Sequence, residues 1–198
     1  MLILTDELIG IPRFSMCHGT GATWHMDSFN CKKRANRRLH TVVYNMSHFE
    51  DDSYKKCHGI LDKNLVHVGI PSYDKDWVKF IIEQQKPPKE EIFDSFVFII
   101  GRPASPFNTV ERKKTALRDI YNTICIKHKL KIVVKTHPKE SIDGIDGQTY
   151  SDTLGIENYG KTWMYSDQHP FILGNKTIFS ISFYSGVALG MLSINKPT

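Results

Sequence analysis

The tetrapeptide Lys135-Thr136-His137-Pro138 places a cation, a hydroxyl and an imidazole directly after the apolar run Ile132-Val133-Val134. The run predicts a β-strand, and ligands of open α/β sheets bind outside the carboxyl ends of the strands. Pro138 favours extended backbone geometry at the residue before it, so we expect His137 at the strand end and not in a helix. Taken alone, the four residues fit an ordinary surface turn better than a functional site.

A second candidate histidine lies in a glycine-rich turn near the start of the chain. His18 is followed by Gly19-Thr20-Gly21, after an expected short strand at residues 13–17. The glycines permit unusual backbone angles and a close ligand approach. A neutral imidazole near its ordinary pKa suits general-base catalysis on a hydroxyl. A turn histidine without a catalytic role is an equally good interpretation.

Two further strand ends carry small, basic or hydroxyl-bearing residues, which we take as candidate ligands for phosphate. They follow the apolar runs 96–100 and 177–181 and are Gly101, Arg102, Ser182, Ser185 and Gly186. A diphosphate needs backbone N–H groups at a helix start, small residues for close approach, and cations or hydroxyls. The arginine, Lys135 and His137 would supply the last of these. Ser185 would equally serve as an ordinary helix N-cap.

Composition places the chain among ordinary globular proteins. It has 198 residues, of which 40% are hydrophobic and 24% charged, and a formal net charge of +5. No apolar stretch approaches the length of a membrane span, and no signal peptide opens the sequence. The four cysteines are scattered without a C-x-x-C pair, which argues against a zinc site or a disulfide framework and favours a reducing, cytoplasmic compartment. The basic residues 32–38 suit a solvated loop or an anionic substrate better than nucleic acid.

Apolar runs alternate with helical patterns along the chain, which predicts an α/β fold with Rossmann-like parallel sheets. The expected strands are 13–17, 41–44, 65–68, 96–100, 131–135 and 177–181, and the expected helices lie near 77–81, 108–129 and 187–192. Residues 140–159 are rich in Gly, Asp and Ser, and we expect a long loop there. A proline-containing linker at 84–91 predicts two lobes, 1–88 and 89–198, with a cleft between them.

The short motifs occur in a distinctive order. They are His18-Gly19, Val68-Gly69-Ile70-Pro71, Lys135-Thr136-His137-Pro138, the serine-rich strand end, Ala188-Leu189 and Asn195-Lys196-Pro197. This order resembles the GT-B superfamily of glycosyltransferases. Within it, the chain looks most like bacterial surface and capsule polysaccharide transferases and CDP-glycerol glycerophosphotransferases. The resemblance covers nearly the whole chain, and it implies a fragment truncated at both ends.

The resemblance implies a metal-independent transferase without a cofactor, which moves a glycosyl or glycerophosphoryl group from a nucleotide-activated donor to a saccharide or polyol hydroxyl. His18 would be the base on the acceptor, the first lobe would bind the acceptor, and the second would bind the donor. His137 would contact or protonate the donor phosphate, and Ser182 and Ser185 would hold the phosphates. A cytoplasmic enzyme of surface polysaccharide biosynthesis would fit, including one at the inner face of the membrane or one that forms a homodimer.

Two departures from the family patterns limit the choice of substrate. Gly21-Ala22-Thr23 replaces the Pro and nearby Lys of the glycerophosphotransferases, and Asp143-Gly144 follows the His-Pro motif, whereas in sialyltransferases the acidic-Gly motif precedes it. The alternatives are an enzyme similar to UDP-sugar 2-epimerases, which share the two-lobed fold, and a non-catalytic module that binds nucleotide sugars or glycans.

Overall fold

The computed structural model describes residues 13–16, 41–45, 51–58, 60–84, 91–106, 108–183 and 185–198. The chain divides into two compact units, Met1–Asp74 and Lys75–Thr198. The division therefore falls earlier than the boundary expected near residue 88. Helix α2 (Lys75–Glu83) packs against α5 (Pro170–Lys176), so it belongs to the second unit. His18 and the basic residues 32–38 lie outside the described residues.

The first unit contains a three-stranded parallel sheet with the strand order β1-β2-β3. Its strands are β1 (Arg13–Met16), β2 (Thr41–Asn45) and β3 (Leu65–His67), close to the three strands that the sequence predicts. Helix α1 (Asp51–His58) lies between β2 and β3 along the chain and was not predicted. Its sequence, DDSYKKCH, has almost no apolar side chains, so it shows no helical stripe to recognise.

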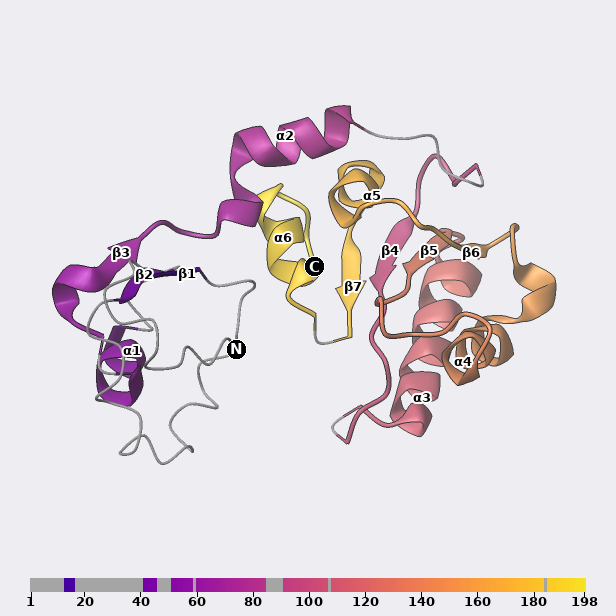
Figure 1. Cartoon of the computed structure of the whole chain (residues 1–198). Coiled ribbons are helices and arrows are strands. Elements are labelled where there is room, and N and C mark those ends of the chain that lie inside the picture. The colour runs from indigo at the N-terminus through magenta and orange to yellow at the C-terminus, as the bar shows by residue number, and fades with distance from the viewer. Residues whose placement is uncertain are drawn as a thin grey trace. The chain divides into compact units, whose positions relative to one another are not determined.

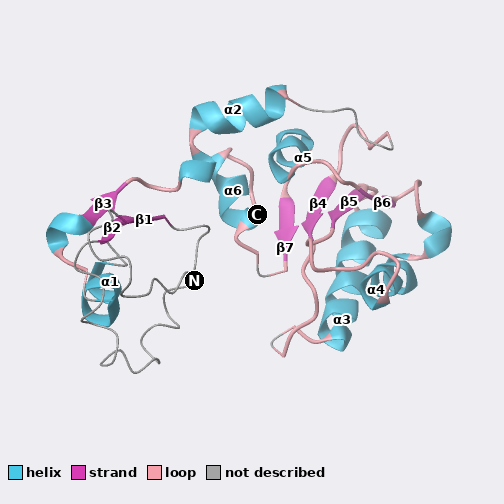
Figure 2. Cartoon of the chain, in the orientation of Figure 1, coloured by secondary structure: helices cyan, strands magenta, loops and turns pink. Residues whose placement is uncertain are grey.

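The second unit contains a four-stranded parallel sheet with the order β6-β5-β4-β7 (Figures 1 and 2). Its strands are β4 (Val97–Ile100), β5 (Ile132–Lys135), β6 (Trp163–Tyr165) and β7 (Ser180–Ser182). All of β4 and the first three residues of β5 are buried, which explains their uninterrupted apolar sequences. The parallel α/β class predicted from the sequence is confirmed.

Two helices cover one face of this sheet and form its main core (Figure 1). Leu117 of α3 (Val110–Tyr121) and Tyr150 and Leu154 of α4 (Ile145–Leu154) pack against Ile99 and Trp163 of the strands. Helix α3 begins inside the expected range 108–129, with Thr109 as its N-cap, whose side chain accepts a hydrogen bond from the Arg112 amide. It continues as a π-helical segment, Asn122–Lys127. Helix α6 (Val187–Ser193) packs against β7 and α5.

The prediction of a long loop at residues 140–159 is wrong, because α4 occupies the middle of that segment. Its content of Gly, Asp and Ser is typical of a loop, but Gly147 lies inside the helix because of a packing requirement. A Cβ atom at Gly147 would lie 1.6 Å from the carbonyl oxygen of Ile142. The tertiary structure therefore demands a glycine inside the helix and overrides its poor helix propensity. Strand β6 was not predicted either.

Candidate functional site

The register of the second sheet brings three of the predicted strand ends into one row. Ile100 of β4 pairs with Lys135 of β5 on one side and with Ser182 of β7 on the other. The Gly101 amide then donates to the Lys135 carbonyl at 2.9 Å. Because the strands are parallel, the residues that follow them emerge at the same edge, as ligand sites of α/β sheets do. The predicted convergence is confirmed for this sheet.

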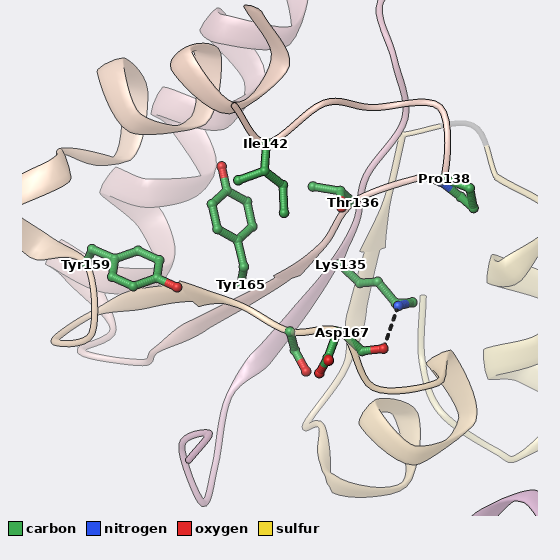
Figure 3. A pocket seen from close by; sticks show the side chains of 8 residues that line it. Lys135, Thr136, Pro138, Ile142, Tyr159, Tyr165 and Asp167 are labelled. Carbon is green, nitrogen blue, oxygen red and sulfur yellow. Dashed lines mark hydrogen bonds between the residues drawn. The ribbon is translucent and has the colours of Figure 1, made fainter. Parts of the chain in front are cut away.

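A pocket of about 470 Å³ opens at the carboxyl ends of β5 and β6. Figure 3 shows that its side chains come from the two strand ends, from the turn before α4 and, for Tyr159, from the segment between α4 and β6. An apolar and aromatic group consists of Pro138, Ile142, Tyr159 and Tyr165. A polar group consists of Lys135, Thr136, Ser166 and Asp167. The sequence identified Lys135 in advance, but it gave no signal for the tyrosines or for Asp167.

Lys135 supplies a positive charge to the polar side of this pocket. Its Nζ donates a hydrogen bond to the Asp167 carbonyl at 3.1 Å (Figure 3). Burial lowers the pKa of this ammonium from its ordinary value, and the nearby Asp167 carboxylate partly opposes the shift. A partly desolvated cation attracts an anion more strongly than an exposed one does, because less water screens the charge.

His137 lies two residues past the end of β5 and outside any helix, and it is not among the residues that line the pocket. Its backbone forms a tight turn with Glu140. The His137 amide donates to Glu140 Oε2 at 2.6 Å, and the Glu140 amide donates back to the His137 carbonyl at 2.8 Å. Inside this turn the Lys139 amide donates to His137 Nδ1 at 3.1 Å. The imidazole is therefore fixed by backbone contacts on one of its two nitrogens.

The Glu140 carboxylate forms a buried ion pair beneath this turn. Lys113 of α3 donates to Glu140 Oε1 at 2.5 Å, and the side chains of the pair are 1% and 0% exposed. Lys113 also donates to the Arg102 carbonyl at 3.0 Å and lies 4.3 Å from the centre of the Tyr150 ring. The Tyr150 hydroxyl donates to the same carboxylate oxygen at 3.1 Å. Both charges are thus compensated and hydrogen-bonded, as buried charges must be.

The remaining predicted phosphate ligands have structural partners of their own. A Cβ atom at Gly101 would lie 2.5 Å from Glu140 Oε2 and 2.7 Å from the Tyr150 hydroxyl, so packing against the ion pair explains this glycine. Ser182 Oγ accepts from the Ser185 amide at 3.1 Å. Ser185 Oγ accepts from the Val187 amide at 3.3 Å, in the manner of an N-cap. The predicted phosphate contacts of these residues and of Arg102 and Gly186 stay predictions.

His169, beside the pocket residue Asp167, was not predicted as a site residue. Its Nδ1 accepts a hydrogen bond from the Phe171 amide at 3.2 Å and so caps α5. Partial burial and the Lys135 cation lower the pKa of this imidazole below its usual value. The unfolded chain, with a His pKa of about 6.5, therefore binds the proton more readily than the folded chain does. Acidification below pH 6.5 should accordingly destabilise the fold through this group.

Replacing His169 with Asn tests this pH dependence, because Asn keeps the capping function without a titratable ring. We expect the wild-type protein to lose more stability than His169→Asn between pH 7 and pH 5. Urea denaturation midpoints measured at both pH values provide the comparison. Equal losses in the two proteins would show that His169 does not titrate differently in the folded and unfolded chains.

The segment Gly155–Thr162 matches the G-x-x-x-x-G-K-[ST] pattern of a phosphate-binding loop. The structure gives it the wrong context, because it runs from helix α4 into strand β6, whereas such a loop leads from a strand into a helix. Most of its amide groups donate to carbonyl oxygens of the segment itself or of its two neighbouring elements, and Lys161 Nζ donates to the Glu157 carbonyl. These amides cannot also bind a phosphate, so the match is coincidental.

In the first unit a carboxylate orients a histidine at the carboxyl ends of two strands. His67 Nε2 lies 2.8 Å and 3.1 Å from the two carboxylate oxygens of Asp51. The buried Asn45 side chain donates to the same carboxylate at 3.0 Å. A histidine held by a carboxylate is a general-base arrangement. His67 was not predicted as a site residue, because the histidines around it show no metal-ligand spacing, and Asp51 lies 16 residues away in the sequence.

The chain matches no model of a known protein family, and it matches none of the curated proteins. In the described parts of the chain, no group of three or more His, Cys, Asp or Glu residues is placed to hold a metal ion. None of the helices in these same parts combines the length and the apolar character needed to cross a membrane.

Proposed function

We propose that this chain belongs to a GT-B-like, two-lobed transferase whose second unit binds a nucleotide-activated donor at the carboxyl edge of its sheet. The reaction would move a glycosyl or glycerophosphoryl group to a saccharide or polyol hydroxyl, with His137 stabilising or protonating the leaving phosphate. The base on the acceptor would be His18, the residue that the resemblance assigns. In this proposal Lys135 neutralises the negative charge of the donor phosphates, and no divalent metal is required.

One observation carries the proposal: the pocket at the ends of β5 and β6 combines a partly desolvated cation with an aromatic wall. A nucleoside diphosphate has both a planar base and an anionic tail, and this pocket offers a surface for each. Tyr159 and Tyr165 suit the base, while Lys135 and Thr136 suit the phosphates. The volume of about 470 Å³ falls within the usual range for small-molecule sites.

Nucleotide binding tests the proposal directly, with CDP, UDP, GDP and CMP as probes. We expect at least one of them to bind, and a probe at 100 times its Kd should raise the stability by about 2.7 kcal/mol. Lys135→Met should weaken the binding of that nucleotide at least tenfold, because a charge-assisted hydrogen bond contributes about 1.5–3 kcal/mol. Isothermal titration calorimetry, with EDTA present, measures both affinities.

Lys139→Met is the matched control, since Lys139 is exposed in the same turn and does not line the pocket. It removes the same charge and should change the affinity by less than twofold. Equal effects of the two substitutions would indicate non-specific attraction to positive charge and would refute the pocket assignment. If both the wild type and His137→Ala bind a donor but neither transfers a group from it, the result would favour a non-catalytic binding module.

A further inference from the structure

We propose that Glu140 is a positioning residue that fixes His137 in one tautomer and presents its Nε2–H group to the ligand. That a ligand binds at this position rests on the proposed function, but the tautomer of His137 does not depend on it. Glu140 would act through the backbone turn and not by contact with substrate. The sequence offered no indication of this, because a Glu two residues after a proline is typical of any exposed turn.

The hydrogen bonds of the turn determine where the imidazole proton lies. Lys139 donates its amide proton to His137 Nδ1, so Nδ1 must hold a lone pair. A neutral His137 therefore carries its proton on Nε2. Within the part of the chain that the structure describes, Nε2 has no hydrogen-bond partner. An N–H donor left without a protein partner at the carboxyl edge of a sheet suits an anionic oxygen of a bound ligand.

Glu140 determines the position of the Lys139 amide because it makes two hydrogen bonds to the backbone of His137 and so closes the turn around Lys139. Its carboxylate accepts from the His137 amide at 2.6 Å and its own amide donates to the His137 carbonyl at 2.8 Å. Without the carboxylate contact, the His137 amide would have to find another acceptor and the turn would lose one of its two closing bonds. The Lys139 amide would then no longer be held opposite Nδ1.

The carboxylate is itself held from two helices that do not line the pocket. Oε1 accepts from Lys113 of α3 and from Tyr150 of α4, which leaves Oε2 for the His137 amide. The Glu140 side chain is completely buried, so its charge is not available to a ligand. Contacts from α3 and α4 therefore hold Glu140, and Glu140 holds the turn that positions the His137 imidazole at the edge of the sheet.

Two double variants separate the positioning role from the stability of the ion pair. Lys113→Met with Glu140→Gln removes both charges but keeps an amide oxygen that can accept from His137. Lys113→Met with Glu140→Leu removes both charges and the acceptor. Neither leaves one member of the Lys113–Glu140 pair buried without the other, and Asp146, whose carboxylate lies 3.7 Å from Lys113 Nζ and is 15% exposed, loses its lysine equally in both. Both are therefore expected to fold, and circular dichroism and a cooperative urea transition would verify this.

The readout is ¹⁵N NMR of the His137 ring and amide at pH 7.5, assigned with a His137→Gln variant. We expect wild type and the Gln double variant to show the Nε2–H tautomer with a protonated Nε2 and an unprotonated Nδ1. The Leu double variant should show a mixture of tautomers and an upfield shift of the His137 amide proton. The same Nε2–H tautomer in the Leu double variant as in the Gln double variant would overturn the positioning role.

Nucleotide affinity gives a second, separate measurement. If a probe binds the wild type, we expect it to bind the Leu double variant at least fivefold more weakly than the Gln double variant. Equal affinities would show that the Nε2–H group does not contact the ligand, even if the tautomer responds as expected. Failure of every nucleotide to bind the wild type would refute the proposed function, whereas the NMR comparison would still decide the role of Glu140.

Discussion

Lys113→Met is expected to lower the free energy of unfolding by about 3–5 kcal/mol, because it leaves the Glu140 carboxylate buried without its counter-ion. The carboxylate would retain hydrogen bonds from the Tyr150 hydroxyl and the His137 amide but would lose the Lys113 ammonium, which lies 2.5 Å from its Oε1 atom. Equilibrium urea denaturation provides the measurement, with an unchanged m-value as the sign that only stability has changed.

The adjacent lysine of the same helix provides the control for this prediction. Lys114 forms an ion pair with Asp152 at 3.5 Å, and both side chains are substantially exposed. Lys114→Met should cost less than about 1 kcal/mol, because exposed ion pairs contribute little. The Lys113→Met, Glu140→Gln double variant should recover much of the lost stability. A loss for Lys113→Met no larger than that for Lys114→Met would mean that the pair is not buried in solution.

Gly101→Ala is expected to lower the free energy of unfolding by about 2–3 kcal/mol, an effect of overpacking. The new Cβ would lie 2.5 Å from Glu140 Oε2 and 2.9 Å from the Lys135 carbonyl oxygen. Neither neighbour can move freely, since Glu140 is held by the ion pair and Lys135 belongs to the central sheet. We also expect the His137 amide resonance to shift, because the displaced carboxylate oxygen is its acceptor. Urea denaturation and ¹⁵N NMR measure the two effects.

Gly144→Ala distinguishes crowding from the general effect of adding a methyl group to a glycine. A Cβ atom there would lie 3.1 Å from the Ser141 side chain, which is exposed and can rotate away. This substitution should change the stability by less than about 1 kcal/mol and leave His137 unaffected. If Gly101→Ala were as stable as Gly144→Ala, the close approach of Gly101 to Glu140 would be contradicted.

The interior strands of the second unit were predictable because burial on both faces leaves a direct mark on their sequences. The run Phe96–Ile100 and the run before Lys135 are apolar at every position, which is typical of central parallel strands. Helix α3 was predictable from its periodic apolar face. By contrast, α1 is polar and α4 contains a required glycine, so local patterns did not reveal these helices, and β6 was not predicted either.

The candidate site was predictable only in its location. A basic and hydroxyl-bearing segment after a buried strand indicated that Lys135 and His137 would emerge at the carboxyl edge of a sheet. The pocket side chains Tyr159, Tyr165 and Asp167 come from a segment about 25 residues further along the chain, and no spacing links them to Lys135. The match to a phosphate-binding loop at Gly155–Thr162 shows the opposite case, in which the sequence pattern is present without the site. A sequence pattern without its strand–loop–helix context has no phosphate-binding geometry.

The sequence alone thus determined the class of fold and the edge of the sheet at which chemistry would be expected, because strand burial and strand ends are local properties. Only the tertiary structure decided what holds that edge in place. Lys113 and Glu140 are 27 residues apart and read as surface charges, yet the packing of α3 against β4 and β5 buries both. A buried ion pair is stable only when all of its hydrogen-bond partners are in place, and here these partners come from separate parts of the chain. A local sequence pattern therefore cannot predict it.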